Sequence, residues 1–300
     1  MPPGHPYRRA LLASVLALCV ILILPAPAGS IPAGTPSLDP VRPYRGLGAW
    51  VDIYDEPAWE HPVRAAIGLR RRGVRTLYLE TCHFNCPHPI HRPTRLAGLL
   101  RAAHAQGIDV VAWYLPGFVR PRRDLQRSLA AIRFRTVDGH RFDSFALDIE
   151  SLELRVGVRN RRVVGLSRRI RERVGPHYGL GAITPPWFFA WRPFPYRALS
   201  RHYDVFMPMN YFTVRAHGAA DARIHTRRNI RLIRRETGNP ETAIHDIGGL
   251  AEDLEPKEVR ALVRTDRREG VVGTSLYDSF TTDSRGWRRL RGELGGRLTP

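Results

Sequence analysis

The sequence contains few cysteines and lacks several common catalytic signatures. Three cysteines in 300 residues exclude a disulfide-rich scaffold. There is no H-E-x-x-H motif, no G-x-S-x-G nucleophile elbow and no zinc-finger spacing, which argues against a zincin, an α/β serine hydrolase and a zinc-finger protein. No glycine-rich phosphate loop follows the first apolar segment, which disfavours a nucleotide-binding open sheet. We therefore expect neither a cofactor nor a metal centre.

Acidic residues are scarce relative to basic ones. The chain has 28 acidic and 47 basic residues, with Lys257 as its single lysine, and a net charge of +19. Such a field favours anionic partners, such as cell-wall polymers, acidic glycans or a membrane surface. The arginines are spread over several segments, so a skewed codon composition explains them equally well. Because no RNA-binding signature or helix-turn-helix occurs, we do not expect nucleic acid as a partner.

The N-terminus is typical of an export signal. Arg8 and Arg9 precede an uncharged apolar run over residues 10–24, and Ala26-Pro27-Ala28 offers small residues for a signal peptidase. The run is short for a membrane span. We expect residues 1–28 to be a cleaved signal peptide, with residues 29–43 as a flexible leader and 44–296 as one domain. The mature protein would carry +17 and no stable membrane span; the alternative is an uncleaved N-terminal membrane anchor.

Two cysteines remain after such cleavage. Cys82 and Cys86 lie four residues apart, and in an oxidising compartment they would form a small-loop disulfide. His83, His88 and His91 lie in the same segment, so a metal site is the alternative. Their spacing is not one of the common zinc patterns.

Short apolar runs alternate with amphipathic stretches along the chain. The predicted strands are Gly46–Ile53, Val74–Glu80, Asp109–Leu115, Ser144–Glu150, Gly179–Thr184, Val205–Tyr211, Thr242–Ile247 and Val271–Tyr277. The predicted helical stretches are 58–72, 93–106, 122–134, 158–174, 194–202, 219–237, 255–268 and 284–292. Nearly continuous apolar strands are typical of a parallel sheet buried on both faces. Eight such units predict a single-domain α/β (β/α)8 TIM barrel.

In that fold, the active site lies where the strands run into the following loops. Polar or aromatic residues occupy these positions on nearly every strand, and such groups are costly to bury unless they are paired or in use. The candidates for substrate binding are Asp52, Glu80, Trp113, Tyr114, Trp187, Asn210, His245, Asp246, Tyr277 and Asp278. Trp50 is expected in the core, and His217 and His225 at the surface.

The fourth predicted strand carries paired acids. Strand side chains alternate, so Asp148 and Glu150 should face the same side, about 6–7 Å apart. Two neighbouring carboxyls repel, and one tends to stay protonated near neutral pH. A protonated and an ionised carboxyl at close range are what glycosidic cleavage needs. The alternative is that both acids make structural hydrogen bonds and ion pairs.

Three strand ends resemble glycoside hydrolase family 18, the chitinase-like barrels. Residues 143–150 are similar to that family's fourth-strand signature D-G-x-D-x-D-x-E, residues 207–211 to its sixth-strand motif, and residues 273–278 to its last strand. The resemblance implies Glu150 as the general acid. It implies that Asp148 orients the substrate amide and that Tyr211 hydrogen-bonds the reacting group.

The chain also departs from that pattern. Ala146 stands where the signature has an inner Asp, Ser144 stands for its Gly, and the third strand lacks the Ser/Gly-rich motif. We therefore expect a more distant, secreted glycosidase-like barrel acting on a cell-wall or extracellular polysaccharide. A non-catalytic carbohydrate-binding barrel at the cell surface is the alternative. A metal-dependent hydrolase using Glu80, His245 and Asp246 is the weaker third possibility.

Overall fold

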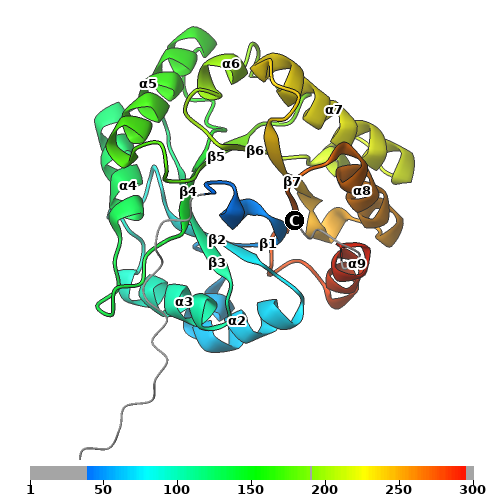
Figure 1. The fold of residues 1–300 in the computed structure, drawn as a ribbon, viewed down its shortest axis with the longest axis horizontal. Coiled ribbons are helices and arrows are strands. Elements are labelled where there is room, and N and C mark those ends of the chain that lie inside the picture. The colour runs from blue at the N-terminus through cyan, green and yellow to red at the C-terminus, as the bar shows by residue number, and fades with distance from the viewer. Residues whose placement is uncertain (1–38, 190, 295–300) are drawn as a thin grey trace, which may run out of the picture. The chain divides into compact units, whose positions relative to one another are not determined.

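The structure is a computed structural model that describes residues 39–189 and 191–294. Eight parallel strands close into a barrel in sequence order, as Figure 1 shows. They are β1 (Gly46–Val51), β2 (Thr76–His83), β3 (Asp109–Leu115), β4 (Ser144–Asp148), β5 (Leu180–Thr184), β6 (Val205–Pro208), β7 (Ala243–Leu250) and β8 (Gly273–Tyr277). The predicted (β/α)8 fold is confirmed.

Helices surround the barrel (Figure 1). They are α1 (Glu56–Glu60), α2 (Pro62–Arg71), α3 (Pro93–Ala105), α4 (Pro121–Arg133), α5 (Val156–Val174), α6 (Tyr196–Leu199), α7 (Ala219–Thr237), α8 (Pro256–Glu269) and α9 (Ser284–Leu294). Short 3-10 helices form at η1 (Arg42–Tyr44), η2 (Phe212–Val214) and η3 (Ala251–Asp253).

Two predicted helical stretches differ from the structure. The stretch at 58–72 is divided into α1 and α2, because Pro62 lacks an N–H group and keeps the preceding His61 out of the helical conformation, at φ −125° and ψ 60°. The stretch at 194–202 contains only the four residues of α6.

The predicted domain limits fall partly outside the described residues. The predicted signal peptide 1–28, the first part of the leader and residues 295–296 all lie there. The last residues of the predicted leader are structured, since η1 begins at Arg42 and Pro43 is buried.

The apolar core has two layers. The larger one lies between the strands and the surrounding helices. The smaller one fills the barrel itself and includes Trp50, Tyr78, Trp113 and Met207. Close packing inside the barrel requires glycine at Gly48, because a Cβ atom there would lie 2.6 Å from the Tyr78 ring.

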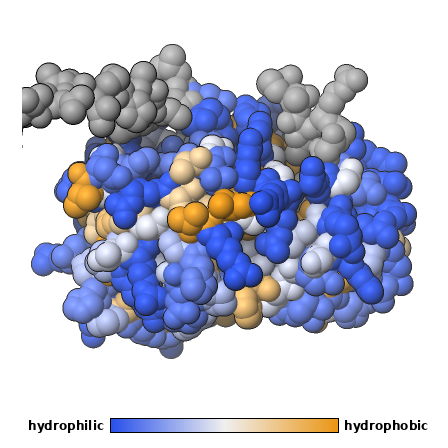
Figure 2. All heavy atoms as spheres, turned by 90° about the horizontal axis from the view of Figure 1, so that it is seen from below, coloured by the Kyte–Doolittle hydropathy of each residue, from blue (hydrophilic) through white to orange (hydrophobic). Residues whose placement is uncertain are grey.

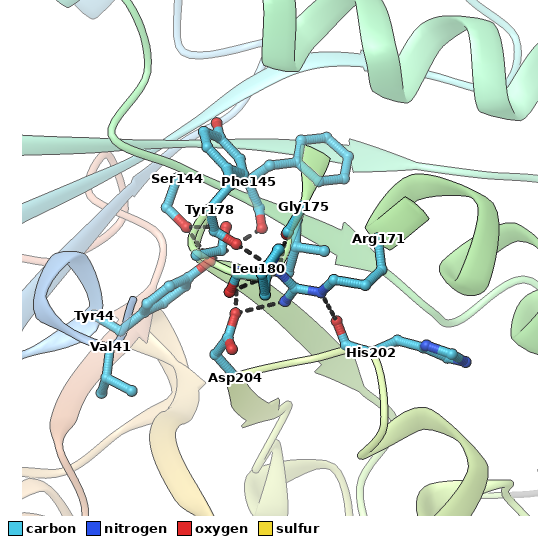
Figure 3. Close-up of polar contacts among 12 residues, drawn as sticks. Val41, Tyr44, Ser144, Phe145, Arg171, Gly175, Tyr178, Leu180, His202 and Asp204 are labelled. Atoms are coloured by element: carbon cyan, nitrogen blue, oxygen red, sulfur yellow. Dashed lines mark hydrogen bonds and ion pairs between the residues drawn. The ribbon is translucent and has the colours of Figure 1, made fainter. Parts of the chain in front are cut away.

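The N-terminal ends of the strands are closed by side chains that satisfy one another (Figure 3). Tyr44 is fully buried, and its hydroxyl lies 2.6 Å from Ser144 Oγ and 3.0 Å from the Phe145 carbonyl oxygen. Arg171 of α5 binds Asp204 at 2.6 Å and donates to the carbonyl groups of His202 and Tyr178. Most polar groups at this end of the barrel are paired and structural, although the buried Tyr178 hydroxyl has no partner among the described residues.

The outer surface is mostly hydrophilic. On the face that Figure 2 shows, apolar side chains occur in small groups among many polar ones. Among the residues that the structure describes, no helix combines the length and the apolar character needed to cross a membrane.

Candidate functional site

The C-terminal end of β4 presents two acids. Asp148 is the last residue of the strand, and Glu150 follows two residues later. Alternation along the strand directs Asp148 to the side of Ala146, which belongs to the cluster inside the barrel. Asp148 is 7% exposed, and its Oδ1 has no hydrogen-bond partner in the described part of the chain. No ion pair between described residues engages either acid.

Burial and mutual repulsion keep protons on these acids. Burial raises the pKa of Asp148 well above its ordinary value, and the charges of Glu150 and Glu80 raise it further. Burial also raises the pKa of Glu150. Asp148 and Glu150 therefore do not both ionise readily at neutral pH.

Glu80, which lies within β2 three residues before its end, belongs to the same acidic cluster. Burial raises its pKa to about 8, with further contributions from Asp52 and Glu150 and an opposing hydrogen bond from the Ile53 amide. That amide donates to Glu80 Oε2 at 3.0 Å. The structure thus brings acids from β1, β2 and β4 together at one end of the barrel.

Asp52 occupies a more strongly hydrogen-bonded position than the other three acids. It accepts hydrogen bonds from the Tyr54 amide at 2.7 Å, the Asp55 amide at 3.1 Å and the Tyr277 hydroxyl at 3.0 Å. The last of these bonds links the ends of β1 and β8. These three bonds hold the Asp52 carboxylate in place at the edge of the cluster.

Aromatic rings line the interior beside these acids. The Trp50 ring centroid lies 5.9 Å from that of Trp113 and 6.2 Å from that of Tyr277. Tyr211 lies 6.3 Å from Tyr277. Burial and the charges of Asp148 and Glu150 raise the pKa of Tyr211 well above its ordinary value, so its hydroxyl remains a hydrogen-bond donor. The Nε1 atom of Trp113 is buried and has no partner among the described residues.

Trp187, in the loop after β5, packs against α7. Its backbone amide donates to Asn229 Oδ1 at 2.8 Å, its indole nitrogen lies 3.2 Å from His225 Nδ1, and the Arg228 guanidinium lies 4.7 Å from its ring. His225 is 7% exposed, so the expected surface position was wrong for this histidine. The ring of Trp187 is held in place by one helix face.

Asp278 lies at the end of β8 and caps the turn that follows. Its Oδ1 accepts from the Thr281 amide at 2.8 Å and from the Thr281 hydroxyl at 3.2 Å. Its charge helps to raise the pKa of Tyr211. This candidate therefore lies near the rest of the cluster while serving a local structural role.

Three residues predicted to bind substrate face the helices and do not join the site. They are Tyr114, Asn210 and Asp246. The Tyr114 hydroxyl donates to Asp124 of α4 at 2.7 Å. Asn210 donates to Thr226 of α7 at 2.7 Å and to Asp246 at 3.1 Å. Each of the three adjoins an inward-facing residue in sequence, and alternation turns it to the opposite side of the barrel wall. The prediction that these three residues bind substrate is therefore wrong, because their side chains lie in the layer between the strands and the helices.

Asp246 instead forms part of a buried acid pair between β7 and α8. Burial raises its pKa to about 7, opposed by hydrogen bonds from Asn210 and Asp266. Burial and the charge of Asp246 raise the pKa of Asp266 well above its ordinary value. Two buried carboxyls in this relation share a proton, so the pair is a structural link behind the barrel wall.

His245 lies within the barrel, close to its N-terminal end. Its Nδ1 atom lies 2.8 Å from the Tyr44 carbonyl oxygen and 3.0 Å from the Tyr78 hydroxyl, and its Nε2 atom lies 3.0 Å from Ser275 Oγ. Burial lowers its pKa to about 4. It is a neutral, fully partnered core residue. The expected role for it in substrate binding is therefore corrected.

The structure joins Cys82 and Cys86 in a disulfide. Arg127, which is 2% exposed, donates to the carbonyl groups of both His83 and Cys86 and so fixes the loop that the disulfide closes. No group of three or more His, Cys, Asp or Glu side chains suited to a metal ion occurs among the described residues. Because Asp246 faces outward and His245 lies low in the barrel, these two do not converge with Glu80.

Some residues around the site did not stand out in the sequence. Trp50 was expected in the core and is indeed 2% exposed, but its ring also borders Trp113 and Tyr277 of the site. His225 and Asn229 reach Trp187 from α7. The sequence offered one signal for His225 and Asn229: they lie four residues apart, which places both on one face of a helix.

Comparison with known proteins supports the fold. No known family model matches this sequence, and no curated protein sequence matches it. The structure is similar to an endo-β-1,4-mannanase from Thermotoga petrophila, with a TM-score of 0.64, 11% identity, and coverage of 86% of this chain and 79% of that one. It is also similar to a chitinase from Bacteroides thetaiotaomicron (TM-score 0.63, 9% identity, coverage 85% and 99%). A third similar structure is a family GH18 chitinase from Cycas revoluta (TM-score 0.59, 11% identity, coverage 83% and 99%). The distant resemblance to glycoside hydrolase barrels is thus confirmed at the level of the fold.

Proposed function

We propose that this protein is an exported glycoside hydrolase that acts on a cell-wall or extracellular polysaccharide. The observation that carries the proposal is the pair Asp148 and Glu150, two protonatable acids without ion pairs to any described residue, beside an aromatic barrel interior. Structural acids are normally paired when they are buried. Acids left unpaired at the C-terminal end of a (β/α)8 barrel occupy the place where its active sites lie.

The chemistry needs a proton on Glu150, and burial raises the pKa of that acid. Glu150, which is only half-buried, donates this proton to the leaving glycosidic oxygen. Asp148, whose pKa burial and the charges of Glu150 and Glu80 raise well above its ordinary value, keeps its own proton and orients an amide substituent of the sugar. The Tyr211 hydroxyl donates a hydrogen bond to the reacting group. Removing the Glu150 proton donor is expected to lower the rate by 10²–10⁴-fold, in the range typical of a general acid.

Aromatic side chains supply the binding surface. Flat rings stack on the C–H faces of sugars at a small cost in conformational entropy. Tyr277 donates to Asp52, Trp113 pairs in register with Glu80 on the neighbouring strand, and Trp187 is held on α7 and is partly exposed. The known activities of the similar chitinase and mannanase structures are consistent with a polysaccharide substrate.

The test is release of reducing sugar from chitin, mannan, peptidoglycan and acidic glycans. Wild type is compared with Glu150→Gln, and the control is Glu172→Gln, which removes one exposed carboxylate on α5 far from β4 in sequence. We expect activity on at least one polymer, loss of that activity in Glu150→Gln and retention in the control. Equal activity in all three proteins would remove Glu150 from the mechanism.

A non-catalytic carbohydrate-binding barrel is the second candidate. The specific observation in its favour is Ala146, a buried apolar residue where the family signature has an acid. This candidate predicts saturable binding of an oligosaccharide that Glu150→Gln leaves unchanged and that no turnover accompanies. Binding without product over a long incubation would therefore replace the first proposal with this one.

Export rests on the N-terminal sequence and on the disulfide. The charged start, apolar run and small residues before position 29 are typical of a secretory signal. The Cys82–Cys86 disulfide is consistent with an oxidising compartment. Mass spectrometry of the protein recovered from the culture medium is expected to give an N-terminus near Gly29. An intact chain retained in the membrane fraction would favour the N-terminal anchor.

A further inference from the structure

A polar cavity lies beside the loop that follows Glu150. It has a volume of about 320 Å³ and lies among the loops after β2, β3 and β4. The residues that line it include Phe84, Asn85, Gly117, Arg120, Arg123 and Glu153. It is close to Glu150, because Ser151, the next residue, donates a hydrogen bond to the Gly117 carbonyl group at 3.4 Å.

Two guanidinium groups border this cavity with donors to spare. Arg120 is exposed, and its guanidinium group makes no hydrogen bond or ion pair to any described residue. Arg123 uses one N–H group on the Cys86 carbonyl oxygen at 2.9 Å. An arginine carries five N–H donors, so most of these donors remain available. The N-terminus of α4 begins at the same place, and its dipole adds to the positive potential.

Two acids also line the cavity and offset part of this potential. Asp124 is buried and already accepts from the Tyr114 hydroxyl at 2.7 Å and the Phe118 amide at 3.0 Å. Glu153 lines the same cavity but lies in no ion pair with a described residue. It therefore remains an acceptor for hydroxyl groups. The cavity offers guanidinium donors and a carboxylate acceptor at once.

The remaining wall is apolar and tightly packed. Phe84 lies against the backbone of Gly117, where an added Cβ atom would come within 3.0 Å of the Phe84 ring. The Cys82–Cys86 disulfide and the buried Arg127 hold the loop that carries Phe84 and Asn85. The cavity is thus preformed, and its volume reaches the range of small-molecule sites.

We propose that this cavity is a subsite for a sugar residue that carries a carboxylate group. A carboxylate matches the planar donors of arginine in a bidentate arrangement, while Glu153 and Asn85 would bind ring hydroxyls and Phe84 would face the sugar ring. The inference rests on the proposed function, because it takes the subsite to bind one unit of the polysaccharide that Glu150 cleaves. It identifies the substrate class as an acidic glycan.

The test measures binding without turnover. The Glu150→Gln protein is titrated by calorimetry with three matched pairs of sugars: glucuronate and glucose, galacturonate and galactose, and N-acetylmuramate and N-acetylglucosamine. We expect the acidic member of at least one pair to bind at least 10-fold more tightly than its neutral counterpart. If none of the three pairs is discriminated, the proposal is overturned.

Three further substitutions in that background locate the site. Arg120→Gln, and the double variant Arg120→Gln/Arg123→Gln, should abolish the discrimination. Arg122→Gln is the matched control, because Arg122 is an exposed arginine of the same helix turn that does not line the cavity. Loss of discrimination in Arg122→Gln equal to that in Arg120→Gln would show a general charge effect and would overturn the subsite.

The two proposals fail in different ways. If the wild type cleaves no polymer but the Arg120-dependent discrimination is present, the catalytic proposal fails and the acidic-sugar site stands. If the wild type cleaves a neutral polymer and no acidic sugar binds preferentially, the catalytic proposal stands and the subsite fails.

Discussion

The two ends of the barrel treat buried polar groups in opposite ways. At the N-terminal end, Arg171 binds Asp204, and the Asp204 carboxylate also accepts from the Leu180 amide at 2.8 Å. Asp143 is held similarly, by the Val110 amide at 2.7 Å and by His104 at 2.9 Å. Each acid at this end lies directly before a strand and joins it to the strand before it.

At the C-terminal end Asp148 and Glu80 are poorly partnered, although Asp52 beside them accepts three hydrogen bonds. Asp148 has a buried oxygen without a partner among the described residues, and the Glu80 carboxylate receives a single amide. Their raised pKa values record a cost of burial that no ion pair offsets. The comparison separates paired acids at one end from two poorly partnered acids at the other, and the proposed function depends on that difference.

The largest predicted effect is at the N-terminal end. Arg171→Met removes the cation that holds Asp204 and the carbonyl groups of His202 and Tyr178. The side chains of Arg171 and Asp204 are 15% and 20% exposed, so the loss leaves a largely buried carboxylate unpaired. We expect the free energy of unfolding to fall by about 3–5 kcal/mol, as measured by urea denaturation.

A matched substitution on the same helix tests this interpretation. Arg168 is exposed and pairs only with Glu172 one turn along α5 at 2.7 Å. Arg168→Met should cost no more than about 0.5 kcal/mol. Equal destabilisation by the two substitutions would contradict the distinction between paired structural charge and surface charge.

The next prediction concerns pH and the C-terminal end. The pKa of Glu80 is raised to about 8 in the folded protein, whereas an unfolded glutamate ionises near pH 4–5. Between these values the folded state binds more protons, so the contribution of Glu80 to stability falls as pH rises through this window. Glu80→Gln keeps an oxygen for the Ile53 amide and removes the titration. At pH 8 we expect it to be more stable than wild type by about 1–3 kcal/mol.

The same experiment at pH 4 supplies the internal control. There Glu80 is protonated in the folded state and mostly protonated in the unfolded state, so most of the gain from Glu80→Gln should disappear. Asp204→Asn should have the opposite sign at pH 8, because it weakens the ion pair with Arg171. If Glu80→Gln is less stable than wild type at pH 8, then the Glu80 carboxylate stabilises the fold, and the contrast between the two ends of the barrel does not hold for this acid.

The sequence predicted much of this difference between the two ends of the barrel. The alternation of strands and helices predicted the barrel, and the barrel predicted where active-site residues lie. Within one strand, the period of two predicted that Asp148 shares a side with Ala146, which belongs to the cluster inside the barrel. These inferences need only local pattern and a known architecture.

The errors share a physical cause. In the pairs Trp113–Tyr114, Asn210–Tyr211 and His245–Asp246, both members end an apolar run, yet only one can face inward. Which one does so depends on strand tilt and register around the closed barrel, and those are properties of all eight strands together. His225 was misjudged for a related reason, since the loop that carries Trp187 covers it and lies more than thirty residues away.

The smallest predicted effect comes from the same substitution made at both ends. Tyr44→Phe removes a hydroxyl that lies 2.6 Å from Ser144 Oγ and 3.0 Å from the Phe145 carbonyl oxygen. We expect a loss of about 1–2 kcal/mol in the free energy of unfolding and an unchanged rate on the polymer that wild type cleaves.

Tyr211→Phe removes a hydroxyl that has no hydrogen bond to any described residue. Its stability should stay within about 0.5 kcal/mol of wild type, and its rate should fall because the reacting group loses a donor. Urea denaturation and initial rates on both variants give the four values. A Tyr211→Phe protein that loses stability and keeps its rate would show that this tyrosine, like Tyr44, serves the fold, and the contrast between the two ends would then not extend beyond the acids.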